Sequence, residues 1–100
     1  MSTIAATAQS GLQAAQLRLA SSAHNVANLH TPGFRSQQVQ QQAVPALGGV
    51  QAQTAQAPQA GVALEAEAVE QVVASYAFKA NVLVLRVAQD MAGTLLDERA

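Results

Sequence analysis

A seven-residue repeat of small and apolar side chains over residues 2–29 is the feature that most constrains how this chain can fold. Ala, Gln and Leu dominate the segment, and all three favour or tolerate helix. Small side chains along one side of a helix let a second helix approach closely. We therefore expect a helix that packs against another. The two rows of the repeat are Ala5, Leu12, Leu19 and Val26, and Ala8, Ala15, Ser22 and Leu29.

The helical pattern stops at Thr31-Pro32-Gly33-Phe34. Pro32 fixes its own φ and disfavours helix in the residue before it, and Gly33 adopts positive φ without steric cost. We expect a turn here, so that residues 1–35 form a helix followed by a turn. Phe34 is expected to pack as an anchor after the turn, and an exposed partner contact is the alternative.

Residues 36–63 differ sharply in composition from what precedes them. They contain no charged residue and nine glutamines, together with Pro45, Pro58 and the pair Gly48-Gly49. Large apolar side chains are so few that burial cannot offset the entropy lost on ordering. We expect a flexible linker of Gln, Ala, Pro and Gly, either an arm that waits for a partner or a spacer.

A second long helix is expected from Leu64 to about residue 97, with residues 64–100 as the C-terminal helical unit. At about 1.5 Å per residue it would be roughly 50 Å long. Glutamates occupy its first turns, where carboxylates oppose the positive end of the helix macrodipole. Residues 82–85 suit a buried strand by local propensity alone, but the helical pattern continues on both sides of them. The expected fold is all-α: two long antiparallel helices, a coiled-coil-like hairpin, joined by a Gln-rich loop.

This second helix is apolar on more than one face, and such a helix needs neighbours on several sides. An isolated hairpin of two helices covers one seam only, so the lone chain should be marginally stable. Either an assembly of many subunits or an antiparallel dimer forming a four-helix bundle would complete the packing. Two rows at heptad spacing are Val69, Tyr76 and Leu83, and Val73, Ala80 and Val87. The apolar surface is widened by Val72, Val84, Leu85, Met91, Leu95 and Leu96.

Composition excludes several classes of function. A net charge of -1 provides no basic field for nucleic acid or anionic membranes, and the absence of cysteine removes disulfides and thiolate chemistry. Residues 1–10 lack a signal-peptide pattern, and no run of about 18 purely apolar residues exists, so neither a cleaved signal peptide nor a membrane span is expected. The spacing of His24 and His30 fits no helical ligand pair, and no nucleophile or phosphate-loop motif occurs. We expect no enzyme activity, cofactor, metal or small-molecule substrate.

The N-terminal part of the chain closely resembles the bacterial flagellar basal-body rod and hook protein family. The residues that carry the resemblance are SGLQAA at 10–15 and NVANLHTPGFR at 25–35. About residues 67–97 of the chain resemble the C-terminal helix of the same family. The matching stretches there are EAV at 67–69, AFKANV at 77–82 and AQDMAGTLLD at 88–97.

The resemblance implies a structural subunit of the flagellar basal-body rod that serves motility. In this family the terminal helices pair as an antiparallel coiled coil that lines a tubular axial assembly. The implied partners are other rod and hook family subunits, copies of the chain itself, and the flagellar type III export apparatus, which secretes subunits without a cleaved signal peptide. The implied location is the periplasm-spanning rod of the basal body.

The chain departs from the family pattern in two ways. The family usually has tyrosine at Phe78 and an acid at Lys79, and the position of Tyr76 is commonly polar. Nearly all of the region that longer members carry between the two helices is missing. This absence motivates a second hypothesis, a helical binding or chaperone-like module that caps an axial flagellar protein.

Three asparagines have two possible roles each. Asn25 and Asn28 either cap the first helix or contact neighbouring subunits through their amides. Asn81 lies within an apolar stretch and either sets the helix register or faces solvent. The residues expected to serve assembly or packing are Leu12, Leu19, Asn25, Val26, Asn28, Pro32, Gly33, Phe34, Val73, Tyr76, Phe78, Ala80, Asn81, Leu83, Val87, Met91 and Leu95.

Overall fold

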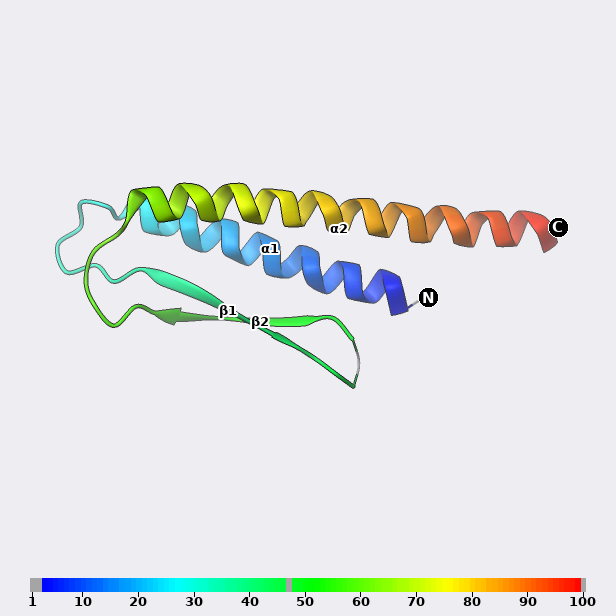
Figure 1. Ribbon diagram of the computed structural model, residues 1–100, viewed down its shortest axis with the longest axis horizontal. Coiled ribbons are helices and arrows are strands. Elements are labelled where there is room, and N and C mark those ends of the chain that lie inside the picture. The colour runs from blue at the N-terminus through cyan, green and yellow to red at the C-terminus, as the bar shows by residue number, and fades with distance from the viewer. Residues whose placement is uncertain (1–2, 47, 100) are drawn as a thin grey trace.

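The chain forms two long helices and a β-hairpin in a computed structural model that describes residues 3–46 and 48–99. Its elements are α1 (Thr3–Ala27), β1 (Gln37–Ala43), β2 (Val50–Gln56) and α2 (Leu64–Arg99). The helices lie side by side and antiparallel, and the hairpin lies along α1, so that α1 separates the hairpin from α2 (Figure 1). Because α2 has 36 residues and α1 has 25, α2 extends beyond the start of α1.

The predicted turn after α1 is confirmed. The amide of Phe34 donates to the carbonyl of Thr31 over 3.2 Å, and Gly33 has a φ of 73°. Proline followed by a positive-φ glycine at the two central positions is typical of a type II turn. The turn reverses the chain after α1 and directs it back along the helix as β1.

The prediction of an all-α fold with a Gln-rich loop is wrong, because residues 36–63 contain the antiparallel hairpin of β1 and β2. Three cross-strand pairs join glutamine to glutamine: Gln37 with Gln56, Gln40 with Gln53, and Gln42 with Gln51. Gly48 and Gly49 both have positive φ, at 75° and 87°, and reverse the chain between the strands. Glycine pairs favour such reversals, but glutamine on both faces hides the alternation that marks a strand.

The interior of the molecule is made of very small side chains. In the part of the chain that is described, the buried apolar residues are all alanines, namely Ala5, Ala8, Ala14, Ala15 and Ala74. The accessible surface is 6982 Å², whereas a compact monomer of this mass would expose about 5,400 Å². The dimensions of 63 × 25 × 14 Å agree with a thin, elongated molecule.

The seam between the helices uses one predicted row of α1 and neither predicted row of α2. Ala8, Ala15 and Ser22 are buried as expected. On α2, the residues that face α1 recur at three- and four-residue spacing and include Ala74 and Asn81. Close approach to the alanine and serine row of α1 requires small residues opposite it. The bulky rows of α2 therefore lie outside the seam.

Candidate assembly surface

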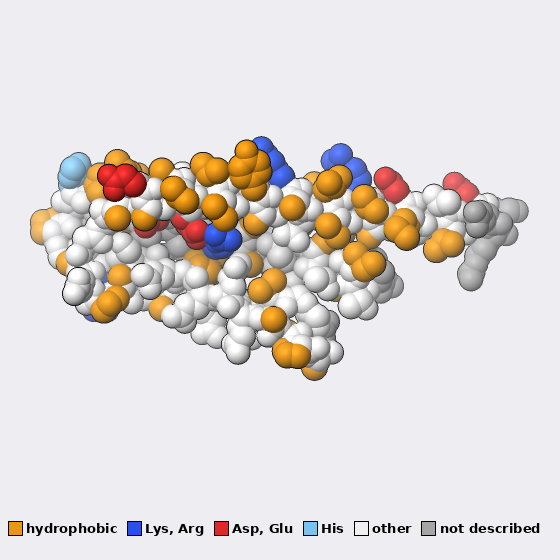
Figure 2. Space-filling view, viewed as in Figure 1, with side chains coloured by type: hydrophobic (Ala, Val, Ile, Leu, Met, Phe, Trp, Pro, Cys, Tyr) orange, Lys and Arg blue, Asp and Glu red, His pale blue; other side chains and the backbone are white. Residues whose placement is uncertain are grey.

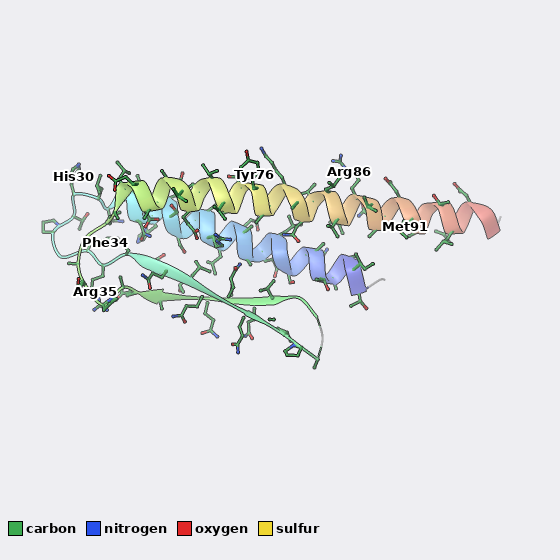
Figure 3. The ribbon with its side chains drawn as sticks, in the orientation of Figure 1. His30, Phe34, Arg35, Tyr76, Arg86 and Met91 are labelled. Carbon is green, nitrogen blue, oxygen red and sulfur yellow. The ribbon has the colours of Figure 1, made fainter. Side chains whose placement is uncertain are left out.

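The most prominent exposed feature is an apolar stripe along α2. We call it the outer stripe and define it by Val69, Val72, Val73, Tyr76, Leu83, Val84, Val87, Met91 and Leu95, all of which are exposed. Tyr76 is 69% exposed and Leu83 is 60% exposed. Three- and four-residue spacings place these side chains on one side of the helix. Hydrophobic side chains gather along α2 in Figure 2, and Tyr76 extends from the side of α2 away from α1 in Figure 3.

The outer stripe continues into an apolar groove at the free ends of the helices. The groove has a volume of about 480 Å³, and Ile4 of α1 lines it together with Met91, Leu95 and Leu96 of α2. Ile4 is 55% exposed and Leu96 is 66% exposed. The last turns of α2 therefore leave most of the groove's apolar lining in contact with solvent. Apolar surface thus remains open at the end where α2 extends past α1.

Contrary to the sequence prediction, α2 is long and apolar enough to cross a membrane, judged by length and composition over Leu64–Asp97. It is the single such helix among residues 3–46 and 48–99. Length and composition are weak grounds for a membrane helix, since a helix that packs against partner helices meets the same criteria.

Asn25 joins α1, β1 and α2 through one buried amide. Its side chain is 1% exposed. Its Oδ1 accepts from the amide of Gln37 over 2.7 Å, and its Nδ2 donates to the carbonyl of Gln37 over 2.9 Å and to Glu67 Oε2 over 3.1 Å. The side chain therefore pairs with β1 as a neighbouring strand would. It does not cap α1, so the capping interpretation is wrong for Asn25.

Asn28 caps α1, as one of the two interpretations predicted. Its Nδ2 donates to the carbonyl of His24 over 2.9 Å, and its Oδ1 accepts from the hydroxyl of Thr31 over 3.1 Å. Phe34 is half-buried and packs edge-to-face on the ring of His24 at 5.4 Å. These contacts tie the end of α1 to the turn that follows it.

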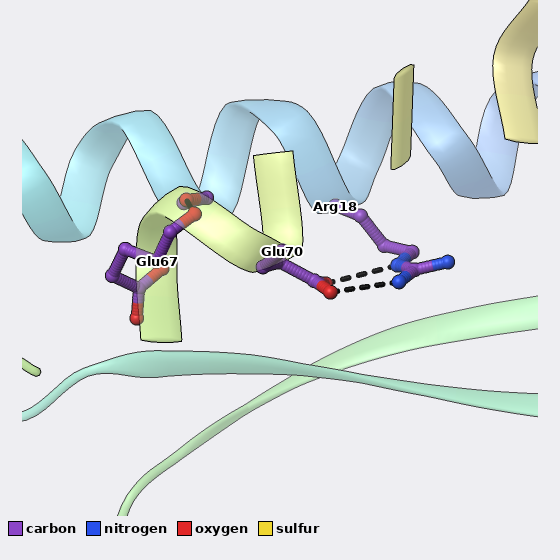
Figure 4. A network of polar contacts seen from close by, with 4 residues as sticks. Arg18, Glu67 and Glu70 are labelled. Atoms are coloured by element: carbon purple, nitrogen blue, oxygen red, sulfur yellow. Dashed lines mark hydrogen bonds and ion pairs between the residues drawn. The ribbon is translucent and has the colours of Figure 1, made fainter. Parts of the chain in front are cut away.

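Arg18 and Glu70 clamp the two helices together (Figure 4). Arg18 Nε donates to Glu70 Oε2 over 2.9 Å, and Nη2 donates to Oε1 over 2.7 Å. This bidentate hydrogen bonding lowers the pKa of Glu70, although partial burial opposes the change. The same bond raises the pKa of Arg18. The ion pair fixes how far α2 can slide along α1.

Ser10 attaches the far end of the hairpin to α1. Its hydroxyl donates to the carbonyl of Thr7 over 2.7 Å and accepts from the amide of Val50 over 3.1 Å. A Cβ at Gly49 would lie 2.5 Å from this hydroxyl oxygen. Glycine at 49 therefore serves both the positive φ and the close approach of the hairpin to α1.

The structure divides the predicted assembly residues into three groups. Leu12, Leu19 and Val26 are half-buried beside the alanine row of α1. Phe78 and Asn81 are half-buried on α2, and Pro32 and Gly33 are exposed in the turn. The exposed residues of α2 are Val73, Tyr76, Ala80, Leu83, Val87, Met91 and Leu95. Their role in contacts between subunits stays a prediction.

Sequence reasoning missed three groups that organise the fold: Arg18 with Glu70, the hydroxyl of Ser10, and the backbone of Gln37. Each acts across 12 or more positions in the chain. An arginine in the middle of an otherwise uncharged helix was the one available signal. Within the described ranges, no group of three or more His, Asp or Glu residues could hold a metal ion.

A family model described as flagella basal body rod protein matches residues 6–35, which cover α1 and the turn after it. The comparison with curated proteins returns no match. The resemblance of residues 67–97 to the C-terminal helix of the family stays a prediction. The match confirms the predicted resemblance over residues 6–35, where the chain is similar to the flagella basal body rod protein family.

Proposed function

We propose that this chain is a structural subunit of the flagellar rod that assembles through α1 and α2 into a tubular axial structure. The similarity of residues 6–35 to the rod family supports a structural role at the basal body and association with other rod components. The observation that carries the finer proposal is the contrast between an interior of alanines and the exposed outer stripe.

The outer stripe is the surface that neighbouring subunits would cover. A stripe of this length is more apolar surface than isolated monomers usually leave in water. Burial of apolar area contributes roughly 25 cal/mol per Å², so covering side chains such as Leu83 and Val87 would add the stability that the alanine interior lacks. Helices from other rod family subunits supply a matching apolar surface, and contacts between unlike faces generate an open helical array.

Export fits the same physical picture. A chain whose helices gain most of their stabilising contacts on assembly unfolds readily beforehand, which suits passage through the narrow flagellar type III export channel. We infer that the chain reaches the rod by this route.

The direct test is mass spectrometry of hook–basal bodies purified from the native host. We expect the chain at a fixed ratio to other rod proteins. Leu83→Gln combined with Val87→Gln should lower its incorporation at least tenfold, because both side chains lie in the outer stripe. The matched control, Arg86→Gln combined with Asp90→Asn, changes two exposed polar residues over the same turns and should be incorporated normally.

Absence of the wild-type chain from intact basal bodies would overturn the proposal. Recovery of the chain instead in a soluble one-to-one complex with an axial protein would favour the chaperone-like capping role. Equal incorporation of the stripe variant and its control would show that α2 does not make the subunit contacts.

A further inference from the structure

The hairpin has two strand edges, and the contacts of Gln37 show which residues point out of each. Because both backbone groups of Gln37 bond to Asn25 rather than to β2, Gln37 faces away from its partner strand. Outward and inward residues alternate along an antiparallel ladder. The outward residues that follow on β1 are Val39, Gln41 and Ala43, and those on β2 are Val50, Ala52, Thr54 and Gln56.

Among the described residues, side chains of α1 hydrogen-bond to each strand edge at the first residue of the strand. Asn25 bonds to the edge of β1 at Gln37, and Ser10 bonds to the edge of β2 at Val50. These two residues lie at opposite ends of the hairpin. The later part of each strand is therefore left open, and the two open edges lie at diagonally opposite corners. Gln41 on β1 and Thr54 on β2 are both exposed.

Nothing in the composition of the hairpin opposes pairing with another strand. Unpaired strand edges are templates for strand addition, and proteins usually protect them with charges, proline or a covering element. Residues 36–63 contain no charge, so two copies would not repel each other here. The two prolines of this segment, Pro45 and Pro58, lie outside both strands. Glutamine side chains also form hydrogen-bonded ladders between neighbouring strands.

We propose that the open edge of β1 in one copy pairs with the open edge of β2 in a second copy, forming a continuous antiparallel sheet. The partner strand comes from a second copy of this chain. The sequences of β1 and β2 are compatible as antiparallel neighbours, because they already pair with each other inside one chain. Joining unlike edges leaves one open edge on each copy, so the pairing extends from subunit to subunit. This proposal concerns the hairpin alone and does not depend on helix packing within the rod.

Outward residues must face outward residues, and the open ones are Val39, Gln41 and Ala43 on β1 and Ala52, Thr54 and Gln56 on β2. Pairing all three on each edge places Gln41 of one copy opposite Thr54 of the next. Val39 then faces Gln56, and Ala43 faces Ala52. A one-residue slip would place side chains on opposite faces of the sheet, so the register can be tested at single-residue resolution.

Cysteine cross-linking tests the pairing in a chain that has no cysteine of its own. One preparation carries Gln41→Cys, a second carries Thr54→Cys, and the two are mixed and oxidised. Directly opposed residues in a hydrogen-bonded pair have Cα atoms about 5.5 Å apart, within the range of a disulfide. We expect the mixed dimer to form at least five times faster than either dimer of identical variants.

The matched control replaces Thr54→Cys with Gln53→Cys, an equally exposed position whose side chain points to the other face of the sheet. Its mixture with Gln41→Cys should cross-link at the background rate. Equal rates for the two mixtures would overturn the proposal.

A second measurement separates this proposal from the rod proposal. Thr54→Pro removes an outward amide without removing a bond inside the hairpin, so it should abolish the association detected by cross-linking between Val39→Cys and Gln56→Cys, the neighbouring opposed pair. The combined Leu83→Gln and Val87→Gln variant should cross-link through the hairpin at the wild-type rate. Persistence of cross-linking in Thr54→Pro would count against edge pairing, whatever the behaviour of the stripe variant.

Discussion

Asn25 is a buried polar side chain that makes three hydrogen bonds. Two of them go to the backbone of Gln37, which would otherwise need a neighbouring strand to satisfy it. Both of its amide atoms are used, so each polar group at the junction of α1, β1 and α2 is satisfied. A buried donor or acceptor left without a partner costs about 1–3 kcal/mol. The cost of changing Asn25 should therefore far exceed that of changing a surface asparagine.

We predict that Asn25→Ala destabilises the chain by about 2–4 kcal/mol, because it leaves both backbone groups of Gln37 without their side-chain partner. Asn28→Ala is the control and should cost about 0.5–1 kcal/mol, since its capping bonds are exposed. Thermal melting followed by circular dichroism gives both values. Amide hydrogen exchange at Gln37 should accelerate in Asn25→Ala and not in Asn28→Ala. Unchanged protection at Gln37 in Asn25→Ala would contradict the hydrogen bonding of Asn25 to β1.

Gly11 of α1 faces the side chain of Asn81 of α2 across the seam. A Cβ at Gly11 would lie 2.5 Å from Asn81 Oδ1, while Asn81 Nδ2 donates to the carbonyl of Ala77 over 2.8 Å. The amide of Asn81 thus occupies the space that an alanine at position 11 would need. This contact supplies a physical basis for the predicted role of Asn81 in setting register.

A double-mutant cycle tests that role. We predict that Gly11→Ala destabilises the wild-type chain by about 1–2 kcal/mol, since overpacking outweighs the gain of about 1 kcal/mol in helix propensity. In the Asn81→Ala background the same change should stabilise, because the space is free. Urea denaturation of the four proteins gives the coupling, and additive effects would show that the two residues do not interact.

Between elements, the Arg18–Glu70 pair makes the helix–helix contact sensitive to acid. The pKa of Glu70 in the folded chain lies below its ordinary value of 4.5. Its contribution to stability is therefore complete above that ordinary value and is lost as the pH falls through the lower folded value. The Glu70 side chain is 35% exposed, so solvent screening limits the contribution to about 0.5–1 kcal/mol.

We predict that Glu70→Gln lowers the melting temperature at pH 6–8 and that the difference from wild type shrinks below pH 4.5. Arg18→Gln should give the same pH profile, and the double variant should be no worse than either single one. Thermal melts across this range provide the comparison. A difference that stays constant down to pH 3 would contradict the pairing, since about 0.5–1 kcal/mol should disappear there.

At the same scale, the helices and the turn were predictable and the hairpin was not. Long apolar periodicity marks α1 and α2, and Pro32-Gly33 specifies its turn by backbone geometry alone. The hairpin depends on hydrogen bonds from Asn25 and Ser10 of α1. These contacts join residues that are far apart in the chain, so the local sequence of the hairpin gives no sign of them. The inner face of α2 was equally hidden. A helix that is apolar over several faces does not reveal which face its partner takes.

The whole molecule is a rod 63 Å long with a radius of gyration of 17.3 Å, whereas a compact domain of this length would have about 13 Å. Its two helices run side by side, and α2 continues past the start of α1 (Figure 1). A molecule of this shape leaves more of its surface exposed than a compact domain would.

We predict that helix content depends on protein concentration. In dilute buffer the chain should show reduced helicity, with a gradual thermal transition that sharpens and moves upward as concentration rises, because association stabilises the folded form by mass action. Circular dichroism over a hundredfold dilution, paired with analytical ultracentrifugation, measures both quantities. A sharp melt of a monomer that does not change with dilution would contradict this expectation.

The alanine interior also determines how the sequence can drift over generations. Apart from glycine, every replacement at Ala8, Ala15 or Ala74 increases side-chain volume, so mutation inside this molecule wedges the helices apart and almost never opens a void. Selection should therefore act there against bulk, while the outer stripe tolerates any shape that its neighbours accept. An ancestor with larger interior residues would have had a wider spacing between its helices and a thicker wall in any tube that it built.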